Sequence, residues 1–177
     1  MNSRSQRGFT ILELLITIAL LAILLSVAVP SFLSAIQNSR MTASANDLVT
    51  AFQLARSEAL KRKRPISVCS SSDGATCGGS WEQGWIVVID DEDAAGEATV
   101  SEEEVLRVWG SLGGGATIAG DDAADFVRYL PDGQIDIAPG VTPPEYEMRI
   151  PDCTGDKQRN ISIGRTGRAS AERVECS

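Results

Sequence analysis

The sequence predicts an α+β protein in which a long N-terminal helix packs on an antiparallel β-sheet. Residues 14–29 are almost all Leu, Ile, Val and Ala, and this apolar run is long enough for a helix that crosses a bilayer. Behind it, apolar residues recur at spacings of three and four, as on one face of a helix: Met41, Ala45, Leu48, Phe52, Ala55 and Ala59. After Pro65 the pattern changes to short β-like runs between clusters of Gly, Asp and Ser, which predicts a β-rich head.

The residues in front of the apolar run are basic. Arg4 and Arg7 lie there, and the positive-inside rule keeps such a stretch in the cytoplasm, so the rest of the chain is expected on the far side of the membrane. Glu13 is unusual at the start of the run, because a carboxylate in lipid costs about 3 kcal/mol unless it is paired or interfacial. A plain membrane anchor and a cleaved secretory signal that ends near residues 26–28 are the alternatives.

Residues 7–13, with the sequence RGFTILE, and the apolar run behind them resemble the class III leader of type IV prepilins and type II secretion pseudopilins. The resemblance implies that prepilin peptidase cleaves between Gly8 and Phe9 and that the new Phe9 amine is N-methylated. It also implies an assembly role for Glu13, whose carboxylate would meet the Phe9 amine of a neighbouring subunit. Each charge neutralises the other inside the apolar core of a filament.

Two further features concern the long helix. Pro30 is expected to break it, because the missing N–H and the ring clash kink or loosen a turn. The basic run at residues 61–64 precedes Pro65 at the expected helix end, where cations complement the helix dipole. Contacts of this run with anionic lipid, a neighbouring subunit or nucleic acid are the alternatives.

The head is expected to contain strands at Ile66–Cys69, Trp85–Asp90, Val105–Trp109, Phe126–Leu130, Gln134–Ile137, Tyr146–Ile150 and Asn160–Ile163. The sequence PDG at residues 131–133 predicts a hairpin turn, because Gly133 accepts a positive φ. Residues 55–59 (ARSEA), Val68, Cys69, Trp81 and residues 84–90 (GWIVVID) resemble the GspH/FimT family of minor pilins. The resemblance covers nearly the whole chain and implies a type IV pilin fold with a head like a β-sandwich.

These observations divide the 177 residues into four expected segments. They are a cleaved leader at 1–8, a transmembrane and filament-core helix at 9–36, the amphipathic half of the same helix at 37–64, and a periplasmic β-rich head at 65–177.

The cysteines and the missing histidine limit the chemistry. All four cysteines follow the apolar run, which suits disulfides in an oxidising compartment. Proximity favours Cys69 with Cys77 and Cys153 with Cys176, although four cysteines allow three connectivities and a zinc site is the alternative. Histidine is absent, which excludes Ser-His-Asp and Cys-His catalysis. We therefore expect no enzyme activity, no catalytic residue, no metal, no cofactor and no small-molecule substrate.

Aromatic and acidic residues of the head each allow two interpretations. Trp81, Trp85 and Trp109 are expected in the core, with a carbohydrate platform as the alternative. The acidic stretch from Asp90 to Glu104 is expected to be a solvated loop rather than a calcium site, because its spacing does not fit an EF-hand.

The C-terminal loop between Cys153 and Cys176 is locally basic in a chain whose net charge is −8. Its cations are Lys157, Arg159, Arg165, Arg168 and Arg173. Residues 164–168, with the sequence GRTGR, resemble the Gly-Arg-rich loop with which FimT-type pilins hold DNA, where guanidinium groups reach phosphates. The usual motif is Gly-Arg-x-Arg, and the inserted Gly167 departs from it. Surface or subunit-contact arginines are the alternative.

The resemblance as a whole implies a minor type IV pilin that primes pilus assembly and acts as a tip-proximal adaptor. Its expected partners are other minor and major pilins, prepilin peptidase and the inner membrane. A DNA-binding minor pilin for natural transformation and an H-type minor pseudopilin of a type II secretion system are the alternatives. The expected location is the bacterial inner membrane, with the head in the periplasm, and the pilus filament.

Overall fold

The computed structural model describes residues 9–91, 100–101, 104–119, 125–151 and 153–176. The leader at 1–8 and most of the acidic stretch lie outside these residues. The elements are α1 (Ile11–Arg62), β1 (Ile66–Ser70), the 3₁₀ turn η1 (Trp81–Gln83), β2 (Trp85–Ile89), β3 (Glu104–Trp109), β4 (Thr117–Ala119), β5 (Phe126–Tyr129), β6 (Glu145–Arg149), β7 (Gln158–Ile163) and β8 (Ala169–Val174). The chain forms two compact units that divide after Gln37.

The first unit contains the apolar part of α1. Thr10 caps the helix: its hydroxyl accepts the N–H of Glu13 at 3.2 Å and its carbonyl accepts the N–H of Leu14 at 3.1 Å. The most apolar window of the helix has a mean hydropathy of 2.7, and none of it is buried by the described residues. By length and composition α1 is able to cross a membrane.

The chain does not leave the helix at Pro30, because α1 is helical on both sides of this residue and through it, whereas a kink of the helix there stays a prediction. A proline inside a helix removes one N–H and so one backbone hydrogen bond. Here the helix has 52 residues, and its long flanking turns retain the helical path despite that loss.

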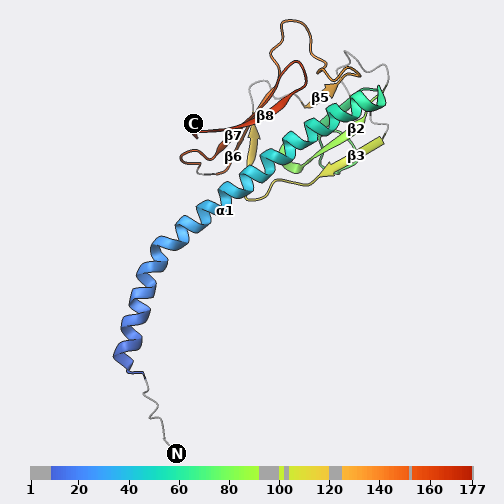
Figure 1. Cartoon of the computed structure of the whole chain (residues 1–177). Helices are drawn as coiled ribbons and strands as arrows, with labels where there is room; N and C mark the ends of the chain where they lie inside the picture. Colours follow the sequence, from blue (N-terminus) through green and yellow to red (C-terminus); the bar gives the residue numbers. More distant parts are fainter. Residues whose placement is uncertain (1–8, 92–99, 102–103, 120–124, 152, 177) are drawn as a thin grey trace, which may run out of the picture. The chain divides into compact units, whose positions relative to one another are not determined.

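The head contains two four-stranded sheets, with the orders β3-β2-β1-β5 and β4-β6-β7-β8 (Figure 1). Every neighbouring pair in both sheets is antiparallel. In the first sheet Val68 lies opposite Val87 and Val127. In the second, Ile161 lies opposite Tyr146 and Ala171. The predicted α+β class, with a long helix on antiparallel sheet, is confirmed.

The second half of α1 supplies the helical side of the head's core. Every residue of the predicted apolar stripe is buried, and Ala51 joins it. The Phe52 ring lies 5.8 Å from that of Tyr146 on β6, and the Trp81 ring of η1 lies 5.1 Å from the same tyrosine. These three aromatic side chains join α1, η1 and the second sheet, so the helix carries the head.

Most predicted strands are present, but Gln134–Ile137 is not one of them. Gly133 forms the expected turn with φ of 80°, and Leu130 donates its N–H to Gln134 at 2.8 Å. Only Ile135 then forms a bridge, with Tyr129, and its own N–H donates to the Arg165 carbonyl at 3.3 Å. The Asp136 N–H also donates to the Arg128 carbonyl at 2.9 Å, so the segment pairs with β5 over a short stretch without extending into a strand.

The predicted pairing of the cysteines is confirmed: Cys69 is bonded to Cys77, and Cys153 to Cys176. Trp81 and Trp85 are buried, whereas Trp109 is half-buried and stacks on Trp85 with ring centroids 6.4 Å apart. Among the described residues no group of Cys, Asp and Glu is arranged to hold a metal ion.

Candidate functional site

The first candidate site is the start of α1. Phe9 is 78% exposed, and the Glu13 side chain is exposed in the first helical turn, whereas Gly8 lies outside the described residues. Thr10 and Glu13 have the spacing of a capping box, and the Thr10 hydroxyl satisfies the Glu13 N–H. A carboxylate is favoured here by the helix dipole, yet the apolar residues that follow require it to find a cation in lipid or in a protein core.

The apolar side chains behind Glu13 are exposed as a group. Among them are Leu14, Ile18, Leu21 and Leu24, whose exposed fractions range from 52% to 68%. Exposed apolar surface of this extent marks a protein or membrane contact. The start of α1 therefore combines one exposed carboxylate with a long exposed apolar surface.

The second candidate site is the C-terminal hairpin. Within the segment called the C-terminal loop, the predicted strand at Asn160–Ile163 is present as part of β7, and residues 169–174 form β8, which pairs with β7 along its whole length. The turn between them is closed by the N–H of Gly164, which donates to Arg168 at 2.9 Å, and by the N–H of Gly167, which donates to Gly164 at 2.8 Å. The motif at residues 164–168 is therefore the tip of a β-hairpin. β8 was missed because its sequence, ASAERV, has a single β-branched residue.

Gly167 has a structural reason to be glycine. Its φ is 77°, and a Cβ built on it would lie 2.2 Å from the Gly133 carbonyl oxygen and 2.9 Å from the Tyr129 ring. Arg56 of α1 donates from Nε to the same Gly133 carbonyl at 3.1 Å. The hairpin tip is thus held against the 131–134 turn and α1. Arg56, which lies within the ARSEA segment at residues 55–59, supports this contact, a role that the sequence alone did not indicate.

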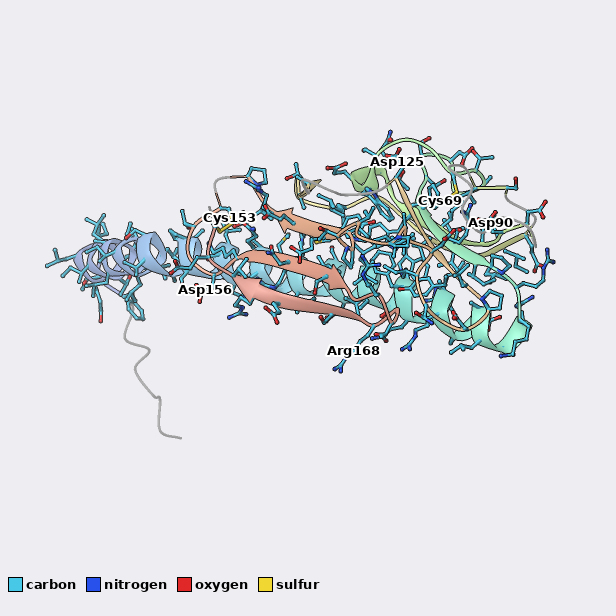
Figure 2. The ribbon with its side chains drawn as sticks, turned by 90° about the horizontal axis from the view of Figure 1, so that it is seen from above. Cys69, Asp90, Asp125, Cys153, Asp156 and Arg168 are labelled. Atoms are coloured by element: carbon cyan, nitrogen blue, oxygen red, sulfur yellow. A yellow bond between two sulfur atoms is a disulfide. The ribbon has the colours of Figure 1, made fainter. Side chains whose placement is uncertain are left out.

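Arg165 and Arg168 flank this tip and are both exposed. The Arg165 guanidinium donates to the Val141 carbonyl. Figure 2 shows Arg168 extending away from the head. The structure therefore brings two of the five cations of the C-terminal segment together at one exposed turn.

Arg159 and Lys157 do not join them. Lys157 precedes β7 and Arg165 follows it, so the strand separates them. Arg159 is only 5% exposed, and its guanidinium donates to Asn38 at 2.6 Å and to Thr42 at 3.0 Å, both on α1. Burial lowers the pKa of Arg159 from its ordinary value. The inclusion of Arg159 in an exposed phosphate-binding set is wrong, because its donors hold the hairpin to the helix.

A buried ionic network was also missed by sequence reasoning. Arg128 on β5 donates from Nε to Asp90 at 2.9 Å and from a terminal nitrogen to Asp136 at 3.3 Å. Asp90 also accepts the Ser67 hydroxyl at 2.7 Å and the Ser101 N–H at 2.8 Å. The side chains of Arg128 and Asp90 are 1% and 0% exposed, so this network anchors the first sheet rather than binding a ligand. The carboxylate at position 90 belongs to the head's interior and not to a solvated loop.

A groove of about 210 Å³ lies between α1 and the C-terminal hairpin. Its lining residues are Thr42, Ala45, Asn46, Arg159, Ala171, Glu172 and Arg173. No sequence pattern indicated it, because its residues come from three separate elements.

Comparison with known proteins gives matches for both parts of the chain. The family model described as type II transport protein GspH matches residues 44–167, and the prokaryotic N-terminal methylation motif matches residues 3–29. No curated protein matches the sequence.

Among solved structures, the type IV minor pilin FimU of Pseudomonas aeruginosa is 21% identical with a TM-score of 0.59, covering 76% of this chain and 89% of that one. A second crystal form of FimU gives 21% identity and a TM-score of 0.56, over 74% of this chain and 91% of that one. The minor pseudopilin EpsH from the type 2 secretion system of Vibrio cholerae is 13% identical with a TM-score of 0.49, over 77% and 97%. The likeness to FimU shows a shared fold.

Proposed function

The chain belongs to the type II transport protein GspH family, and we propose that it is a minor type IV pilin that enters the pilus through α1. The observation that carries the proposal is the exposed apolar half of α1, most of which lies within the region matched by the methylation motif. The same helix continues into the part that carries the head. Such a surface is stable only in lipid or against other apolar helices. Pilins are structural proteins, and the proposed function includes no catalysis.

Processing is the first step of the proposal. Prepilin peptidase cleaves between Gly8 and Phe9, and the new Phe9 amine is N-methylated. Before assembly, the processed chain stays in the inner membrane with its head in the periplasm. Mass spectrometry of the mature chain tests this step: a methylated N-terminal Phe9 supports it, and an intact leader on filament-associated chain contradicts it.

Glu13 guides assembly in the second step. Its carboxylate lies at the start of an apolar surface and lacks a cationic partner among the described residues. The Phe9 amine of a neighbouring subunit would supply the opposite charge, and breaking such a buried pair costs about 3–5 kcal/mol. The pair would therefore select the axial position of each subunit as apolar helices pack together.

The position that we propose is a tip-proximal adaptor that primes the filament. Two disulfides cross-link its head. Glu13 provides an acceptor for the N-terminal amine of another subunit, and such an acceptor suits a subunit that is not the outermost one in the filament. The test is the amount of pili sheared from cells in which the gene is deleted, beside wild-type and complemented cells. A large loss that complementation restores supports priming, and unchanged piliation contradicts it.

DNA binding for natural transformation is a second candidate, favoured by the exposed Arg165 and Arg168 at one hairpin tip. Replacing both with Ala is expected to weaken DNA binding. It should also make the slope of log affinity against log salt shallower by about one for each phosphate that is no longer neutralised. Arg107→Ala, which removes an exposed arginine on β3, is the matched control. Wild-type affinity in the double variant would contradict a DNA site at the tip.

A minor pseudopilin of a type II secretion system is the third candidate, favoured by the family's own description. It predicts that deletion of the gene blocks secretion while pili remain. The genes beside it separate the two systems at little cost: pilus genes favour the first proposal, and secretion genes favour this one.

A further inference from the structure

The groove between α1 and the C-terminal hairpin is lined by two arginines. Arg159 of β7 and Arg173 of β8 are register partners, so they lie directly opposite each other on paired strands (Figure 2 shows this hairpin, with Asp156 near its start). Like charges directly opposite on antiparallel strands are destabilising. The proximity of Arg173 adds to burial in lowering the pKa of Arg159, while Asp156 acts in the opposite direction.

The hydrogen bonds of Arg159 leave its charge without a close counterion. Its guanidinium donates to the carbonyls of Asp156 and Gln158, at 3.1 and 2.9 Å, and to the side chains of Asn38 and Thr42. All four acceptors are neutral. Among the described residues, neither Arg159 nor Arg173 has a carboxylate within ion-pair distance. Two guanidinium groups thus share one groove with only Glu172 as a lining acid.

A positive groove is unusual in this chain, because the chain's net charge is −8. Charge complementarity therefore favours an anionic occupant. The volume of about 210 Å³ suits one side chain rather than a folded element. Arg173 is exposed and offers a forked set of donors that fits a carboxylate, and Asn46 adds a side-chain amide.

We propose that this groove receives the carboxylate of an Asp or Glu side chain from a neighbouring pilin subunit. The inference rests on the proposed filament function. β8 is the last strand of its sheet, so a neighbour has access along that edge. Arg159 holds the groove's shape through α1, and Arg173 makes the contact with the incoming carboxylate.

Photo-crosslinking of the full chain in piliated cells identifies the occupant. A photoreactive amino acid replaces Ala171, which lines the groove, and cross-linked peptides from sheared filaments are sequenced by mass spectrometry. We expect a peptide of another pilin subunit in which an Asp or Glu lies at or beside the cross-linked position. Cross-links to lipid only, or to pilin segments without an acidic residue, would overturn the proposal.

Charge reversal tests the contact itself. Arg173→Glu is expected to lower the amount of chain in sheared filaments by about tenfold, the effect of losing one charge-assisted hydrogen bond. Arg107→Glu on β3 makes the same charge change outside the groove and is expected to leave that amount unchanged. Changing the cross-linked acidic residue to Arg should restore incorporation of Arg173→Glu. Equal incorporation of Arg173→Glu and wild type overturns the groove contact alone, whereas absence of the wild-type chain from filaments overturns the proposed function.

Discussion

Gly167 offers the sharpest test of how the hairpin tip is held. We expect Gly167→Ala to destabilise the head, because an added Cβ would lie 2.2 Å from the Gly133 carbonyl oxygen and the backbone φ of 77° is unfavourable for alanine. The left-handed backbone costs about 1–2 kcal/mol. Overpacking against Gly133 and Tyr129 costs about 1–3 kcal/mol. Alanine also restricts the unfolded chain more than glycine does, which offsets about 0.4–1 kcal/mol of this cost, so the net loss is roughly 1–5 kcal/mol.

Urea unfolding of the head, followed by circular dichroism, measures this loss. With a slope of about 2 kcal/mol per molar urea, the midpoint should fall by roughly 0.5–2.5 M. Gly164→Ala is the matched control at the same tip, since its Cβ would lie 3.8 Å from the Arg168 carbonyl oxygen at an ordinary φ. We expect its midpoint to stay near that of the wild type. Equal midpoints for the two variants would refute the packing of the tip against the 131–134 turn.

Other predictions concern the ionic and polar residues of the head. Asp90→Ala should cost about 3–5 kcal/mol in urea unfolding, because it leaves the buried Arg128 without its closest carboxylate. Glu147→Ala, which removes a half-exposed ion pair with Arg149, should cost at most about 1 kcal/mol. The pKa of Asp73 lies well below its ordinary value, chiefly because the carboxylate accepts the N–H groups of Thr76 and Ala75. Its contribution to stability is therefore complete above the unfolded pKa of about 3.9 and is lost as pH falls further. Asp73→Asn should flatten the decline of the unfolding midpoint below about pH 4, and an unchanged pH profile would contradict this.

Local patterns in the sequence were sufficient to predict the helix, its buried stripe and most strands. The stripe from Met41 to Ala59 follows the helical period over many turns, so one face of α1 had to meet the core. The two disulfides followed from proximity along the chain. The motif at residues 7–13 indicated the family before any tertiary contact was considered, and the methylation motif confirms that resemblance.

Tertiary contacts determine the features that those local patterns did not predict. Arg159 and Arg165 both belong to the basic segment between Cys153 and Cys176, and the sequence does not distinguish them. Arg159 is nevertheless buried, because Asn38 and Thr42 on α1 accept its hydrogen bonds. Strand β8 has little β propensity and forms because β7 offers a full ladder of partners. The contacts of Arg159 with α1 join residues more than a hundred positions apart, and no pattern of neighbouring residues in the sequence predicts such contacts.

The assembly role of Glu13 is the central claim, and the recovery of Glu13→Ala in sheared filaments tests it most directly. The matched control is Asp47→Ala, which removes an exposed carboxylate farther along α1. Both variants should reach wild-type levels in the inner membrane, because neither change reduces the apolar run. We predict that Glu13→Ala falls at least about tenfold in filaments, since a buried partner charge is left unpaired, while Asp47→Ala does not. Recovery of Glu13→Ala at the wild-type level would contradict assembly through this carboxylate.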